Sequence, residues 1–117
     1  MLARAHRLRS NADFDRTYKY GRSANAQNFY IKFYQSHYIT TRIAVVVSKK
    51  ISKRAVVRNR CKRRLVELAR NHFDELLPGY NVIVMAKTDV SNLLSKDLER
   101  EFMTCLSKAG LLVEGSK

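Results

Sequence analysis

The sequence is poor in glycine and proline and has no long apolar run. Four glycines and one proline in 117 residues exclude collagen-like chains and proline-rich linkers. No apolar run approaches the roughly 20 residues that a membrane-spanning helix needs. Hydrophobic residues nevertheless make up 45% of the chain, which is enough for a chain of this length to bury one core. We therefore expect one compact domain over residues 1–117.

Acidic residues are also scarce. The chain has 23 Lys and Arg against 10 Asp and Glu, a net charge of +13, and self-repulsion on this scale is costly unless a polyanion neutralises it. Residues 1–70 contain 18 basic and 3 acidic residues, whereas residues 71–117 contain 5 and 7. Residues 49–70 alone contain ten basic residues and one acid, Glu67. A merely solvated surface usually mixes both signs, so nucleic acid is the expected partner.

The two cysteines and the N-terminal residues bear on the cellular compartment of the protein. Cys61 and Cys105 fall on apolar faces of expected helices without metal-ligand or redox spacing, so we expect buried free thiols in a reducing compartment. The N-terminal residues are arginine-rich but lack an apolar stretch for secretion, and Asp13 and Asp15 argue against a mitochondrial presequence. We expect a cytoplasmic protein without membrane contact. Charge repulsion predicts that residues 1–9 form a flexible basic tail.

The first half of the chain predicts one helix followed by strands. Ser10 can cap a helix over residues 11–20, and Gly21 can end it. Residues 28–36 alternate apolar and polar positions, which predicts a half-buried strand. Residues 42–48 are apolar on both faces, as in an interior strand. A further short strand is possible near residues 22–26.

The second half changes to helical periodicity. A long helix is predicted over residues 53–77, where Pro78 stops it. Residues 80–86 predict another interior strand, and Ser95 can cap a last helix that ends before Gly110. The expected order is α-β-β-(β)-α-β-α, without repeats or linkers. This order predicts an α+β fold with a single-layer sheet of about four strands packed with helices.

The long helix carries a basic stripe opposite its apolar stripe. Arginine matches phosphate oxygens with two parallel hydrogen bonds, lysine supplies point charges, and asparagine can read a base edge or hold a sugar hydroxyl. A surface of this kind is typical of phosphate-backbone binding. The candidate RNA-binding residues are Lys49, Lys50, Lys53, Arg54, Arg58, Asn59, Arg60, Lys62, Arg63, Arg64 and Arg70.

A second candidate site is aromatic. Aromatic side chains can stack on unpaired bases, at about 1 to 3 kcal/mol per base. The candidates lie on the first helix and on the open face of the first long strand: Phe14, Tyr18, Tyr30, Lys32 and Tyr34. Core packing is the alternative for Phe14 and Tyr18, because aromatic pairs four residues apart on a helix commonly pack inward.

The stretch SKKISKRAVVRNRCKRRLVELAR resembles the signature of the bacterial ribonuclease P protein component. The resemblance extends over nearly the whole chain, since LRSNADFDRTYKYG is similar to that family's first helix. It implies a small basic subunit that pairs with a catalytic RNA and with precursor tRNA, whose 5′ leader the RNA removes with bound Mg²⁺. It also implies that the Arg58-Asn59-Arg60 helix faces the catalytic RNA, that a cleft beside Phe14 and Tyr18 takes the leader, and that the β-α-β crossover is left-handed. The chain departs from the family pattern at Val66, where Arg is common, and at Ala44, where Gly is common.

Other functions remain open from the residues alone. A protein-only nuclease would need clustered carboxylates or a positioned histidine pair, and neither the acids of residues 1–70 nor His6, His37 and His72 supply one. We therefore expect no catalytic and no metal-binding residue on this chain, with Mg²⁺ held by the RNA and the substrate. An architectural RNA-binding protein, such as a ribosomal protein, is the alternative, because it would use the same phosphate contacts. DNA binding is disfavoured because a single Asn offers little base-specific readout.

Overall fold

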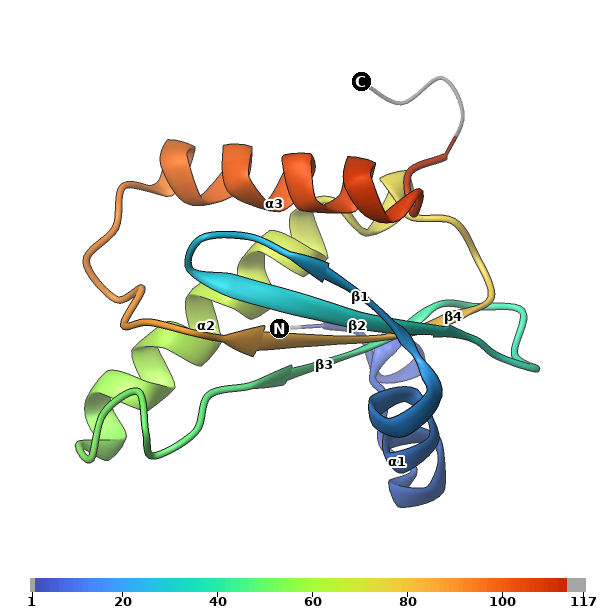
Figure 1. Cartoon of the computed structure of the whole chain (residues 1–117), viewed down its shortest axis with the longest axis horizontal. Coiled ribbons are helices and arrows are strands. Elements are labelled where there is room, and N and C mark those ends of the chain that lie inside the picture. Colours follow the sequence, from blue (N-terminus) through green and yellow to red (C-terminus); the bar gives the residue numbers. More distant parts are fainter. Residues whose placement is uncertain (1, 114–117) are drawn as a thin grey trace.

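The computed structural model describes residues 2–113 and shows one mixed sheet with helices on both of its faces (Figure 1). The elements are η1 (Arg4–His6), α1 (Asn11–Tyr20), β1 (Arg22–Asn25), β2 (Phe29–Gln35), β3 (Arg42–Val46), α2 (Ala55–Asn71), η2 (Phe73–Glu75), β4 (Tyr80–Ala86) and α3 (Ser95–Ala109). The strand order is β1-β2-β4-β3, in which only β3 and β4 are parallel. The predicted α+β fold, its element order and its single four-stranded sheet are confirmed. The left-handed sense of the β3-α2-β4 crossover stays a prediction.

Helix α1 begins and ends at the residues that the sequence indicated. The Ser10 side chain accepts a hydrogen bond from the backbone N–H of Asp13, at 3.3 Å. This bond satisfies one of the free N–H groups at a helix start. At the other end, the Gly21 N–H donates to the Thr17 carbonyl. The helix is therefore fixed at both ends by local hydrogen bonds.

The two faces of the sheet differ. Phe29, Ile31 and Phe33 of β2 are buried on the face that packs on α2 and α3, and they share one core with residues such as Leu65 and Phe102. The alternate residues of β2 lie on the opposite face, where α1 packs. Figure 1 shows α1 and α3 on opposite sides of the sheet. The alternation predicted for this strand is confirmed, and it leaves the second face only partly covered.

Three sequence expectations are corrected. Strand β3 lies at the sheet edge rather than in its interior, because β4 is its one neighbouring strand in the described sheet; Ile43 and Val45 on one face are buried. The long helix ends at Asn71, where the chain leaves helical geometry at His72 and forms η2 before Pro78. Ser95 is the first residue of α3 rather than its cap.

Residues 2–9 pack along the open edge of the sheet, and the flexibility expected for residues 1–9 stays a prediction. Leu2 and Leu8 are 5% and 8% exposed, and the Leu8 N–H donates to the Ile43 carbonyl on the open edge of β3, at 2.9 Å. The His6 ring stacks on the Phe73 ring with a centroid distance of 3.7 Å. Burial of two leucines and pairing of a free strand edge offset the repulsion among the arginines. We call residues 2–9 the N-terminal arm.

The remaining expectations concern cysteines and membranes. Cys61 and Cys105 are buried and free, as predicted, and burial raises the pKa of the Cys105 thiol to about 11. None of the helices in the described chain combines the length and the apolar character needed to cross a bilayer.

Candidate nucleic-acid interface

A ridge of basic side chains follows the outer side of α2 and the turn before it. Helix α2 is anchored through Cys61, Leu65 and Leu68, which are buried, so the opposite side of the helix must face solvent. The members of this basic ridge that are exposed are Lys49, Lys50, Lys53, Arg54, Asn59, Arg60, Lys62, Arg63 and Arg70. Arg58 and Arg64 are partly buried. Most of the predicted RNA-binding residues are thus exposed, on the outer side of α2 and on the turn before it.

The ridge is barely neutralised by the protein itself. Among the described residues, its one ion pair joins Arg70 to Glu67, one turn apart on the same helix. The hydrogen bond from Arg70 lowers the pKa of the Glu67 carboxyl below its usual value, so this acid is charged at neutral pH. Both partners are about half exposed, and a surface pair of this kind is weak. The other cations keep their charge available for a polyanion.

Two arginines of the ridge are held by protein carbonyls. Arg64 donates to the carbonyls of Val90 and Ser91, at 2.8 and 3.1 Å, and to the Ser95 hydroxyl. Arg58 donates to the Ser52 carbonyl at 3.0 Å. The Arg64 side chain therefore ties α2 to the segment before α3. Its guanidinium is therefore already engaged by protein oxygen atoms.

The second candidate site lies on the other face of the sheet, beside α1. The Lys32 ammonium of β2 lies 5.5 Å from the centre of the Tyr18 ring of α1, which is 45% exposed. Burial raises the pKa of the Tyr30 hydroxyl, and the adjacent Tyr18 hydroxyl raises it further. Phe14 and Tyr34 are half-buried, as are Tyr30 and Lys32. The structure thus brings Tyr18, Tyr30 and Lys32 together on one partly exposed aromatic and cationic surface, which we call the aromatic patch.

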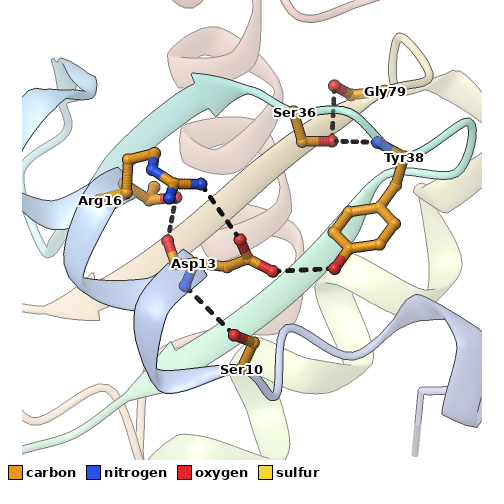
Figure 2. A network of polar contacts seen from close by, with 7 residues as sticks. Ser10, Asp13, Arg16, Ser36, Tyr38 and Gly79 are labelled. Atoms are coloured by element: carbon orange, nitrogen blue, oxygen red, sulfur yellow. Dashed lines mark hydrogen bonds and ion pairs between the residues drawn. The ribbon is translucent and has the colours of Figure 1, made fainter.

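A polar network joins α1 to the loop after β2 (Figure 2). The Tyr38 hydroxyl donates to the Asp13 carboxylate at 3.1 Å, and Arg16 pairs with the same carboxylate at 3.5 Å. The Arg42 guanidinium carbon lies 3.6 Å from the centre of the Tyr38 ring. Tyr38 thereby ties the loop after β2 to the first turn of α1. The sequence pattern does not predict this role, because Tyr38 and Asp13 are 25 residues apart and only the fold brings them together.

Metal-ligating residues do not gather within residues 2–113. No group of three His, Cys, Asp or Glu side chains in this part of the chain could hold a metal ion. The His72 ring, which is 14% exposed, instead lies between the carboxylates of Glu75 and Glu99, at 3.2 and 3.1 Å. It ties η2 to α3 and has a structural role.

A basic ridge on one helix and an aromatic patch beside the sheet are typical of the class of small α+β RNA-binding proteins. Comparison with known families makes the assignment specific. The family model described as "Ribonuclease P" matches residues 2–110. The chain belongs to the ribonuclease P protein family, as the sequence resemblance predicted.

Relatives and solved structures agree with this assignment. The chain is similar to the ribonuclease P protein component of a Nocardioides species, with 34% identity covering 98% of this chain and 100% of the relative. It is also similar to the component from Finegoldia magna, with 36% identity covering 88% and 89%. The RNase P protein of Staphylococcus aureus has the same fold, with a TM-score of 0.81 and 28% identity over 94% of this chain and 100% of that chain. Family membership indicates a role in tRNA 5′ processing, within a ribonucleoprotein that has a ribonuclease P RNA as partner.

Proposed function

We propose that this protein binds the catalytic RNA of ribonuclease P through the basic ridge. The observation that supports this most directly is the exposed, largely unneutralised row of cations on α2. Guanidinium and ammonium groups in such a row contact successive phosphates and release counterions. The binding sites are the exposed members of the ridge, with Arg63 and Lys62 at its centre. Arg58 contributes less, because its guanidinium already donates to a backbone carbonyl.

The aromatic patch binds the single-stranded 5′ leader of precursor tRNA. Its half-exposed rings can stack on unpaired bases, and the ammonium of Lys32 can contact the connecting phosphates. Tyr18, Tyr30 and Lys32 form the centre of the contact, with Phe14 and Tyr34 at its margins. The aromatic patch and the basic ridge lie on different elements, so one protein can contact the precursor tRNA and the catalytic RNA at once.

The protein assists hydrolysis without performing it. The catalytic centre and its Mg²⁺ belong to the RNA and the substrate, and this chain lowers the Mg²⁺ concentration that the reaction requires. Cations on the ridge do this by offsetting phosphate repulsion between the two RNAs, a task that otherwise falls to metal ions. The protein acts in the cytoplasm with RNA partners, without DNA or membranes.

Reconstitution tests this proposal. The protein alone should leave precursor tRNA intact, whereas the protein with a bacterial ribonuclease P RNA at low Mg²⁺ should give correct 5′ cleavage where the RNA alone gives little. Cleavage is measured by gel analysis of end-labelled precursor. Robust cleavage by the protein alone would overturn the assignment of catalysis to the RNA. Absence of any stimulation would favour an architectural RNA-binding protein.

A further inference from the structure

A groove lies between the N-terminal arm, the edge of β3 and helix α2. It encloses about 660 Å³, a volume typical of sites that hold small organic groups. Its apolar lining comes from Leu2, Leu8, Ile43, Ala44, Val45 and Val66. The groove exists because the arm packs along the strand edge rather than extending into solvent. We call it the arm groove.

The rim of the arm groove is cationic on two sides. Arg7 and Arg9 line it from the arm, and Lys62 and Arg63 line it from α2. Its one acidic lining residue is Glu67, whose carboxylate is paired with Arg70. A neutral or basic peptide segment gains nothing from this charge pattern, whereas an anionic chain can run across both rims with an apolar group between them.

Val66 makes the groove continuous with the basic ridge. On α2 it lies between Arg63 and Arg70 along the outward stripe, yet its side chain is half-buried and packs on the core. An apolar gap inside a row of cations cannot hold a phosphate, because burial of that charge beside aliphatic groups is costly. It can hold a flat, largely apolar nucleobase whose flanking phosphates lie outside.

We propose that the arm groove takes one unpaired nucleobase of the partner RNA, with the phosphates on either side of it held by Arg9 of the arm and Arg63 of α2. This site rests on the proposed function, since it assumes that the ridge faces the catalytic RNA. It adds a specific contact to an otherwise phosphate-directed surface. A base in a duplex cannot reach the groove, so the nucleotide comes from a loop, bulge or junction.

Filling the groove without changing its charge tests the proposal. Val66→Phe should weaken binding of the catalytic RNA roughly tenfold, the loss expected for one excluded base. The slope of log affinity against log salt should stay unchanged, because the phosphate contacts remain. Chemical probing should show one unpaired base that is protected by the wild-type protein and reactive with Val66→Phe. Dimethyl sulfate probes A and C, and a carbodiimide probes G and U.

Two further variants control the experiment. Leu94→Phe adds a ring at a side chain that is 61% exposed, outside both the groove and the ridge, and it should bind as the wild type does. Val66→Met fills the groove with a flexible side chain, so it serves if thermal unfolding shows that Val66→Phe is poorly folded. Its affinity loss should be in the same direction and smaller.

The outcomes separate this site from the proposed function. Wild-type affinity in folded Val66 variants would overturn the groove site and leave the ridge intact, as would be found if the groove took a protein segment instead. A weakened affinity with unchanged base protection, or with a shallower salt slope, would also overturn it. Failure of the wild-type protein to bind the catalytic RNA would instead contradict the proposed function itself.

Discussion

The ammonium of Lys32 lies 5.5 Å from the centre of the Tyr18 ring. The two residues come from different elements, β2 and α1, so this contact joins the two sides of the aromatic patch. A cation above the ring adds attraction of about 0.5–1 kcal/mol at an exposed site. It also holds the Tyr18 side chain beside the sheet, while 45% of that side chain remains exposed. A stacking surface that is already ordered loses less entropy when a base binds.

Tyr18→Ala should selectively weaken binding of the leader. We expect roughly tenfold weaker binding of leader-bearing precursor tRNA, because one stacking contact is removed. Binding of leaderless tRNA should change far less. The measurement is the affinity of the reconstituted complex for both RNAs. Tyr20→Ala is the matched control, since this neighbouring ring on α1 is 72% exposed and does not belong to the aromatic patch. Equal losses with both RNAs would assign Tyr18 to packing.

Arg63→Ala should remove one phosphate contact. The Arg63 side chain is exposed, and among the described residues it makes no ion pair. The slope of log affinity against log salt should therefore become shallower by about one. Thermal stability should change little. An unchanged slope in filter-binding titrations with the catalytic RNA would place Arg63 outside the interface.

Arg64→Ala should lower the stability of the protein and leave the salt slope of RNA binding unchanged. Its guanidinium holds the carbonyls of Val90 and Ser91, so its loss should destabilise the protein by about 1–3 kcal/mol. The salt slope should stay as in the wild type. Denaturant unfolding and RNA titrations measure the two effects, and Arg60→Ala, an exposed cation on the same helix, is the control. A shallower slope in a stably folded Arg64→Ala would return this residue to the RNA surface.

The fold could be predicted from the sequence where periodicity and caps act locally. The alternation from Phe29 to Gln35 and the cap at Ser10 are such cases, and both are confirmed. The position of β3 at the sheet edge could not be predicted, because its apolar residues do not reveal which strands flank it. The packing of Leu2 and Leu8 was missed for a related reason. The strand edge that they cover is far from them in sequence.

The candidate site was predictable in the same uneven way. The ridge follows from helical spacing alone, since a helix anchored by Cys61 and Leu65 must turn its arginines outward. Spacing places Arg64 at the flank of the outward stripe that contains Arg63, but it cannot show that Arg64 donates to a carbonyl 26 residues further along the chain. The contact of Tyr38 with Asp13 likewise depends on tertiary packing. Residue types predicted a cationic surface, whereas the hydrogen-bond partners of single side chains became known only from the fold.

Ionisation of Cys105 should make stability fall at high pH. Burial raises the pKa of this thiol from 9.0 to about 11 in the folded protein, so the unfolded chain loses its proton first. The free energy of unfolding should therefore decrease as pH rises from about 9 to about 11, by roughly 2–3 kcal/mol at most. Cys105→Ala should reduce this decrease. Denaturant titrations of both proteins across this range measure the difference, and identical pH profiles would contradict the assignment.

Gly21→Ala should change the position of α1 and thereby the aromatic patch, although Gly21 is not part of that patch. A Cβ at this position would collide with the Thr17 carbonyl and would lie 2.8 Å from the Phe33 carbonyl oxygen, so α1 must shift on β2. We expect a loss of stability of about 1–3 kcal/mol and a loss of the preference for leader-bearing precursor over leaderless tRNA. Gly110→Ala is the matched control. It strains a left-handed residue at the end of α3, and should lower stability by about 1 kcal/mol while the leader preference persists. The same preference in both variants would mean that the position of α1 does not set leader binding.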